Sequence, residues 1–94
     1  MYKDEYHPQI KKDLKKLDKQ VYENIKDKVI IDILQNPSVG EKLTGLFVGL
    51  YSFHFKINNV NYRIAYMLNE DTETVYFIKI GKRENFYEEL RMRF

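Results

Sequence analysis

The sequence predicts an α+β fold in which a small antiparallel β-sheet of three or four strands packs against an N-terminal helical hairpin, with a short helix at the C-terminus. Two patterns predict this fold. Between residues 8 and 37, apolar side chains recur every three or four positions, as in a helix with one buried face. Between residues 51 and 80, apolar and polar residues alternate, as in a strand with one buried face. Helices and strands segregated in this way pack as two layers around one core.

The N-terminal part is expected to hold a weak strand and two helices. Residues 2–6 alternate in a way that suits a short strand, and Pro8 suits the first turn of the helix that follows. The apolar stripe of this helix is Ile10, Leu14 and Leu17. Asp18 is a plausible N-cap of a second helix, which Pro37 ends. The apolar face of this second helix holds Tyr22, Ile25, Val29, Ile30, Ile33 and Leu34. Two helices with a short connection form an antiparallel hairpin.

Three strands are expected after the helices. The first alternates at Tyr51, Phe53, Phe55 and Ile57. Asn58 and Asn59 then suit a turn, because asparagine tolerates left-handed backbone. The second strand covers residues 62–68 and ends at the polar residues 69–72. The third has one face formed by Tyr76, Ile78 and Ile80.

Gly81 is expected to end the third strand, and residues 84–93 to form a short helix with Phe86 and Leu90 turned inward. Together, the three strands are expected to form an antiparallel meander, with one face covered by the helical hairpin. The residues 2–6 add a fourth strand if they pair with the sheet. The other face of the sheet is expected to be partly open.

The composition limits what the chain can be. With 94 residues we expect a single domain, spanning residues 1–94. The absence of cysteine excludes disulfides and thiolate metal sites, and with only two histidines we expect no metal site and no cofactor. No segment approaches the roughly 20 apolar residues of a membrane span, and no signal peptide is seen, so we expect a soluble cytoplasmic protein. The net charge of +2 is too small to indicate nucleic-acid binding by itself.

The open face of the predicted sheet carries the candidate site. His54, Arg63 and Arg83 are expected to share this face, with Tyr87 above it on the last helix. Further positive charge that could contact RNA comes from Lys56, Lys79 and Lys82. Taken singly, His54, the two arginines and the three lysines are better explained by a solvated or structural role, and Tyr87 is explained equally well by a place at the edge of the core. Their joint placement on one face is what indicates a site.

This set of side chains suits cleavage of RNA by its own 2′-hydroxyl. The reaction needs a base for the 2′-proton, cations for the charge on the phosphate, and an acid for the leaving 5′-oxygen. Histidine can take either proton-transfer role near pH 7, and arginine supplies fixed donors to phosphate. Tyrosine can stack on a base, or transfer a proton if its pKa is lowered.

Several local strings occur together in an order that is typical of one protein family. They are KKDLKKLD at residues 11–18, LQNP at 34–37, KLTG at 42–45, YRIAY at 62–66, and IKIGKR at 78–83 followed by Tyr87. No single string is decisive. In this order, and in a chain of this size, they resemble the RelE/ParE superfamily of toxins from bacterial toxin–antitoxin pairs, over nearly the whole length.

The resemblance implies a small antiparallel sheet on an N-terminal helical hairpin, and an endoribonuclease that cleaves messenger RNA in the ribosomal A site. By position, Arg63 and Arg83 resemble the phosphate-binding arginines, and Tyr87 the base-stacking or proton-transfer residue. Ser52 and His54 stand where some ribosome-dependent members have lysine, which makes His54 the candidate general base. Lys82 stands where histidine is frequent. The resemblance therefore does not decide which residue is the general base and which is the general acid.

The resemblance also implies partners and an alternative function. A cognate antitoxin protein is expected to bind the toxin, and messenger RNA and the ribosome are the expected targets of the RNA-cleaving branch. The ParE branch has the same fold, lacks the nuclease residues and inhibits DNA gyrase. A non-catalytic gyrase-binding toxin is therefore the alternative, and a relative that has kept only the fold is a third possibility.

Overall fold

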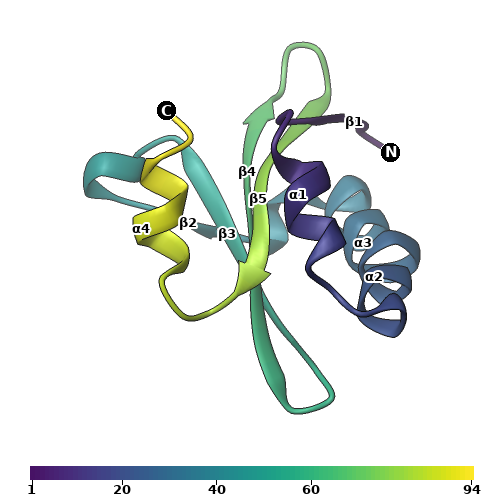
Figure 1. Ribbon diagram of the computed structural model, residues 1–94. Helices are drawn as coiled ribbons and strands as arrows, with labels where there is room; N and C mark the ends of the chain where they lie inside the picture. The colour runs from purple at the N-terminus through teal and green to yellow at the C-terminus, as the bar shows by residue number, and fades with distance from the viewer.

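The computed structural model describes residues 1–94 and contains one five-stranded sheet (Figure 1). The strands are β1 (Lys3–Tyr6), β2 (Glu41–Lys42), β3 (Leu50–Ile57), β4 (Val60–Asn69) and β5 (Thr74–Lys82). Their order in space is β1-β5-β4-β3-β2. β1 runs parallel to β5, and each of the other neighbouring pairs is antiparallel. A parallel pair needs a long crossover connection, and here residues 7–73, with three of the helices and strands β2–β4, lie between its members.

The helices lie on both faces of this sheet. They are α1 (Ile10–Lys15), α2 (Lys19–Asn24), α3 (Ile30–Gln35) and α4 (Phe86–Arg91), with a π-helical turn (Ile25–Val29) that joins α2 to α3. In Figure 1, α1, α2 and α3 stand on one side of the sheet and α4 stands on the other. None of the helices is long and apolar enough to cross a membrane.

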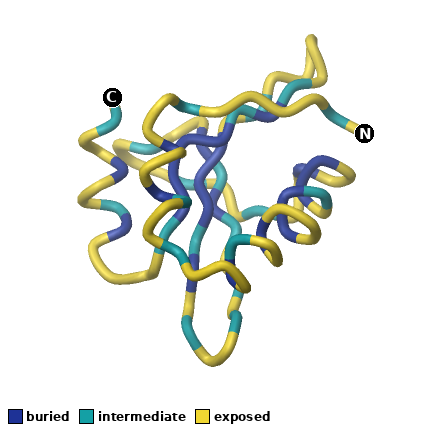
Figure 2. The backbone as a smooth tube through the Cα atoms, turned by 45° about the vertical axis from the view of Figure 1, so that its right-hand side comes forward, coloured by how far each residue is buried: buried dark blue, intermediate teal, exposed yellow.

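Each face of the sheet has its own apolar core. On the side of α1–α3, the fully buried side chains include Ile25, Ile33, Ile64, Tyr66 and Phe77. On the side of α4, the core is smaller and consists of Leu50, Ala65, Ile78, Phe86 and Leu90. Figure 2 shows the buried backbone concentrated in the central strands, while both hairpin turns of the sheet are exposed. The central strands β4 and β5 contribute to both cores.

The predicted α+β class is confirmed, and several details of the prediction are wrong. The sheet has five strands where three or four were predicted, because the parallel strand β1 and the two-residue strand β2 extend it at both edges. The predicted helical hairpin is also inaccurate in detail. The first helix is only Ile10–Lys15, and the second is interrupted by the π-helical turn.

A β-bulge in β5 overturns the predicted face of this strand. Ala65 pairs with Lys79 and the next residue, Tyr66, pairs with Phe77, so Ile78 has no partner in β4. The extra residue shifts the alternation of side chains. As a result Ile80 packs with Phe77 in the core under α1–α3, while Ile78 packs under α4. Ile78 and Ile80 therefore do not share a face.

Candidate functional site

The β3–β4 pairing positions the first two candidate residues. His54 and Arg63 are direct partners across this antiparallel pair, on the face that α4 partly covers. Partners of this kind have Cβ atoms about 4.5–5.5 Å apart. His54 is exposed and Arg63 is partly buried. The neighbouring pair on the same face is Ser52 and Ala65, both fully buried.

Tyr87 reaches this face from α4. The guanidinium carbon of Arg63 lies 5.1 Å from the centroid of the Tyr87 ring, within the range of a cation–π contact. The Tyr87 hydroxyl donates a hydrogen bond to Oγ of Ser52 at 3.2 Å. The ring also packs against Phe47 and Phe86, with centroid distances of 5.8 and 5.4 Å. Ser52, Phe47 and Phe86 thus hold Tyr87 beside Arg63. Ser52 belongs to the cross-strand pair next to the His54–Arg63 pair on this face.

The electrostatic surroundings favour the neutral form of His54. Partial removal of the imidazole from solvent by its neighbours lowers the pKa of His54 below its ordinary value of 6.5, and the positive charge of Arg63 lowers it further. The carboxylate of Glu41 acts in the opposite direction and raises the pKa. At neutral pH the imidazole is therefore uncharged and able to accept a proton.

Glu41 is a residue of this site that the sequence analysis missed. β2 pairs Glu41 with Ser52, so alternation along β2 and β3 brings the Glu41 carboxylate to the face that carries His54. A strand of two residues has no period, so no pattern in the sequence marks it as a strand. The only sequence signal was an acidic residue next to the KLTG string.

Arg83 extends the same face beyond the end of β5. Its backbone amide donates to the carbonyl oxygen of Asn61 at 3.1 Å, which continues the β4–β5 ladder by one pair. Gly81 is the partner of Arg63, and a Cβ atom at Gly81 would meet nothing closer than 3.9 Å. Alternation therefore places Arg83 on the face of Arg63, two residues beyond Gly81, which carries no side chain. The side chain of Arg83 is exposed.

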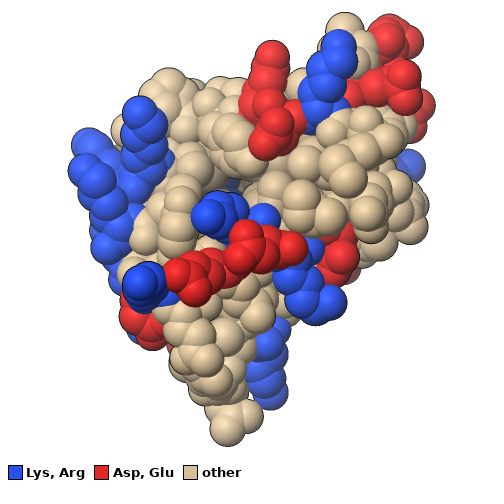
Figure 3. Space-filling view, turned by 90° about the vertical axis from the view of Figure 1, so that its right-hand side faces the viewer, with Lys and Arg blue, Asp and Glu red and all other residues tan.

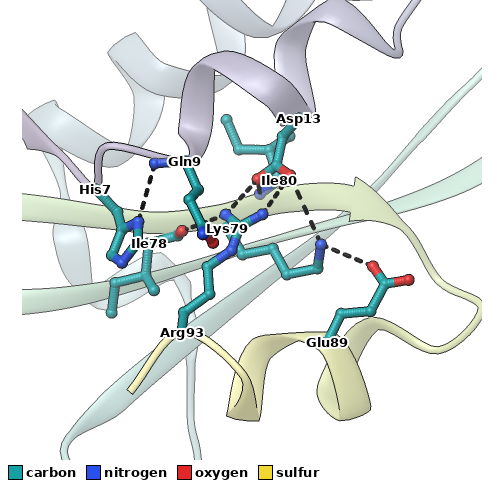
Figure 4. A network of polar contacts seen from close by, with 8 residues as sticks. All are labelled: His7, Gln9, Asp13, Ile78, Lys79, Ile80, Glu89 and Arg93. Carbon is teal, nitrogen blue, oxygen red and sulfur yellow. Dashed lines mark hydrogen bonds and ion pairs between the residues drawn. The ribbon is translucent and has the colours of Figure 1, made fainter.

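The three candidate lysines differ in their positions. Lys56 is exposed and lies on the face of His54, opposite Asn61. Lys79 is only 5% exposed and forms an ion pair with Glu89 at 2.9 Å, so it is not available to RNA in this structure, in contrast to the expectation (Figure 4). Lys82 is the partner of Tyr62, whose ring lies in the core on the other side of the sheet. Alternation therefore directs Lys82 away from the site, also in contrast to the expectation.

The candidate site is an open surface. A hollow of about 1150 Å³ lies around Leu43, Met67 and Tyr76 and includes none of the candidate residues. No three His, Asp or Glu side chains lie together in a way that could hold a metal ion. Figure 3 shows the opposite, helix-bearing side, where basic side chains gather at one edge and acidic and basic ones are interspersed elsewhere. An open face with two arginines suits an extended anionic polymer better than an enclosed small molecule.

Comparison with known proteins gives a family and several similar structures. The model of a family described as ParE-like toxin of type II bacterial toxin-antitoxin systems matches residues 5–91. The isolated E. coli RelE toxin is similar with a TM-score of 0.69 at 27% identity, covering 99% of this chain and 98% of that one. A chain of the RelBE2 toxin–antitoxin complex of Mycobacterium tuberculosis has a TM-score of 0.77 at 22% identity, covering 87% and 98%.

A variant of E. coli RelE with two arginines replaced by alanine, in the free state, has a TM-score of 0.74 at 23% identity, with 98% of this chain and 96% of that one covered. No curated protein matches the sequence.

Proposed function

The chain belongs to the ParE-like toxins of type II bacterial toxin–antitoxin systems, and we propose that it acts as an endoribonuclease that cleaves messenger RNA at the ribosomal A site. The observation that carries the proposal is the placement of His54, Arg63 and Tyr87 in one contiguous group on an open sheet face. Arg83 lies on the same face beyond Gly81. Similarity to the isolated RelE toxin over nearly the whole chain supports the RNA-cleaving branch.

Each residue has a distinct role in the proposed reaction. The 2′-oxygen attacks the adjacent phosphorus, the bond from phosphorus to the 5′-oxygen breaks, and a cyclic phosphate and a free 5′-hydroxyl result. Neutral His54 accepts the 2′-proton, and Arg63 and Arg83 stabilise the charge on the phosphate oxygens. Tyr87 is the candidate donor to the leaving oxygen, because its phenolic hydroxyl is a hydrogen-bond donor, and its ring offers a surface on which a base can stack. Lys56 adds positive charge at the end of the face.

The proposed partners are messenger RNA, the ribosome and a cognate antitoxin. Similar structures include RelBE complexes of a toxin with its antitoxin, which supports an antitoxin partner for this chain. A second candidate function is inhibition of DNA gyrase without RNA cleavage. The description of the matching family as ParE-like favours it, since the ParE branch resembled by this sequence acts in that way.

Primer extension on a translated messenger RNA, after induced expression of the toxin, tests the proposal. We expect cuts within codons, and we expect Arg83→Ala or His54→Ala to reduce them roughly 100-fold or more, as for the loss of an electrostatic or acid–base group. Arg91→Ala is the matched control, because Arg91 is also an exposed arginine near the C-terminus and lies outside the site. It is expected to cleave as the wild type does.

The same cultures separate the two candidate functions. Growth arrest without cuts, together with loss of supercoiling when the purified protein is added to gyrase, would establish the gyrase-binding alternative. Cuts that persist unchanged in the Arg83→Ala, His54→Ala double variant would remove both residues from the mechanism.

A further inference from the structure

A buried carboxylate in α1 is contacted by donors from β5 and from the residues that follow α4 (Figure 4). Asp13 is 4% exposed. Its two oxygens accept hydrogen bonds from the two Nη atoms of Arg93, each at 2.6 Å, and one of them also accepts from the backbone amide of Ile80 at 3.0 Å. Nζ of Lys79 lies 3.7 Å away. A forked, charge-assisted contact of this kind fixes the orientation of both partners.

The Asp13–Arg93 contact lies beside the part of β5 that has no neighbouring strand on its outer side. β1 pairs with β5 only as far as Phe77, and the chain then turns into α1. Beyond this point the carbonyl of Ile78 accepts from Nη1 of Arg93 at 2.7 Å, and the amide of Ile80 donates to Asp13. Two side chains thus make the edge hydrogen bonds that a longer β1 would make.

The same contact anchors α4. Arg93 follows α4, which ends at Arg91, and its side chain is 9% exposed. On the inward face of α4, Phe86 and Leu90 are buried against the sheet. Glu89 forms an ion pair with Lys79 at 2.9 Å, which lowers the pKa of the Glu89 carboxyl. α4 is therefore held by apolar contacts along its length and by the Asp13–Arg93 pair at its C-terminal end.

We propose that Asp13 and Arg93 are positioning residues that hold α4 on β5 and so keep the Tyr87 ring against Arg63 and Ser52. Neither residue touches the open face, and they act through the helix that carries Tyr87. Their effect on RNA cleavage rests on the proposed function, whereas the anchoring of α4 does not. The first experiment below tests the anchoring and the second tests its effect on cleavage.

Hydrogen exchange of the full-length protein tests the anchoring. In Arg93→Ala and in Asp13→Asn, which keeps an acceptor for Ile80, we expect the amides of Glu89 and Leu90 to exchange at least roughly tenfold faster, and amides of β4 to change by less than about twofold. In NMR spectra, the nuclear Overhauser contact between Tyr87 and Arg63 is expected to weaken.

Arg91→Ala, on the same helix but without a polar partner, is expected to match the wild type in both measurements. Arg93→Lys keeps the positive charge but loses the paired guanidinium donors. Its exchange rates in α4 are expected to lie between those of the wild type and of Arg93→Ala. Unchanged exchange in α4 would overturn the proposal. Equal acceleration in α4 and β4 would also overturn it, because the pair would then stabilise the whole fold without specifically holding the helix.

A double-mutant cycle tests the effect on cleavage. With a translated messenger RNA as substrate, Arg93→Ala is expected to lower kcat roughly 10- to 100-fold with KM within about twofold, as for a misplaced catalytic group. In a Tyr87→Ala background the same change is expected to have no further effect, because both act on one element. If the two substitutions lower kcat independently, so that their factors multiply in the double variant, a role of Arg93 through Tyr87 is contradicted. If the wild-type protein cleaves no RNA, the proposed nuclease function fails, and the exchange and NMR measurements still decide the anchoring.

Discussion

At the scale of single residues, the neighbours of His54 determine its pKa, and therefore whether it is suited to act as a base or as an acid. Partial burial and the charge of Arg63 lower the pKa of His54, and Glu41 raises it. A histidine in these surroundings is neutral at the pH of the cell and is suited to act as a base. The sequence placed His54 and Arg63 on neighbouring strands, but the contribution of Glu41 emerged only when β2 was seen to pair with β3.

The pH dependence of cleavage follows from these shifts. A general base is active when deprotonated, so the rate should rise with pH through the pKa of His54 and level off above it. Because this pKa is lowered, we expect the half-maximal rate below pH 6.5. Glu41→Gln removes the group that raises the pKa, so the rise should move to still lower pH. A rise that stays in place in Glu41→Gln, in single-turnover rates measured from pH 5 to 8, would contradict this assignment.

A second prediction at this scale concerns Tyr66 in the main core. Its fully buried hydroxyl donates to the carbonyl of Pro37 at 2.6 Å and accepts from the amide of Gly40 at 3.1 Å. Tyr66→Phe leaves both backbone groups without this partner, so we expect the free energy of unfolding to fall by about 1–3 kcal/mol. Urea denaturation measures this. Tyr51→Phe is the control, because the Tyr51 ring stacks on Tyr66 while its hydroxyl makes no hydrogen bond; an equal loss in both variants would refute the explanation.

Gly40 is required at its position for the same reason. A Cβ atom there would overlap the hydroxyl oxygen of Tyr66 and come within 3.2 Å of Cβ of Tyr51. The close approach of backbone to tyrosine therefore leaves no room for a side chain, which is a common cause of glycine at a strand entrance.

At the scale of secondary structure elements, Asp18 defines where the second helix begins. Its side chain accepts a hydrogen bond from the amide of Val21 at 2.9 Å, as an N-cap does. The predicted cap is thus confirmed, because capping depends on residues close in sequence. The π-helical turn inside the same helix was not predicted, since the apolar residues on either side keep an ordinary helical spacing.

Removing the cap should weaken the helix without changing the fold. In Asp18→Ala, the amide of Val21 loses its partner, and we expect the free energy of unfolding to fall by about 0.5–2 kcal/mol. Chemical denaturation followed by circular dichroism measures the change. Asp27→Ala, in the exposed part of the π-helical turn, removes an acidic residue that caps nothing. The interpretation fails if this control loses as much stability as Asp18→Ala.

At the scale of the whole molecule, one sheet serves two cores. β4 alternates between them, with Ile64 and Tyr66 on the side of α1–α3 and Ala65 on the side of α4. Because β4 and β5 contribute side chains to both cores, full unfolding of either core disrupts the strands on which the other is built. We therefore expect the two cores to unfold together.

A matched pair of substitutions tests this cooperativity. Ile33→Val in the larger core and Ile78→Val in the smaller one each remove one methylene from a fully buried side chain. Each should lower the free energy of unfolding by about 0.5–1.5 kcal/mol. Each variant should also unfold in a single transition with the same midpoint by circular dichroism and by tyrosine fluorescence. Two separate midpoints in the Ile78→Val protein would show that α4 and its core are an independent unit.

The sequence by itself determined the fold class, the two helical regions, the β3-to-β5 meander and the face that carries His54 and Arg63. These features follow from periodicity, capping and turn chemistry, which act between residues a few positions apart. The candidate site was predicted in the same way, because alternation along two adjacent strands is a local property.

Only the tertiary structure decided the features that depend on residues distant in sequence. β1 joins β5 in parallel across the length of the chain, and Asp13 meets Arg93 from 80 residues away. The bulge at Ile78 and the burial of Lys79 also depend on how α4 and α1 pack against β5. No pattern of nearby residues encodes such contacts, because their free energy is gained only when the whole sheet has formed.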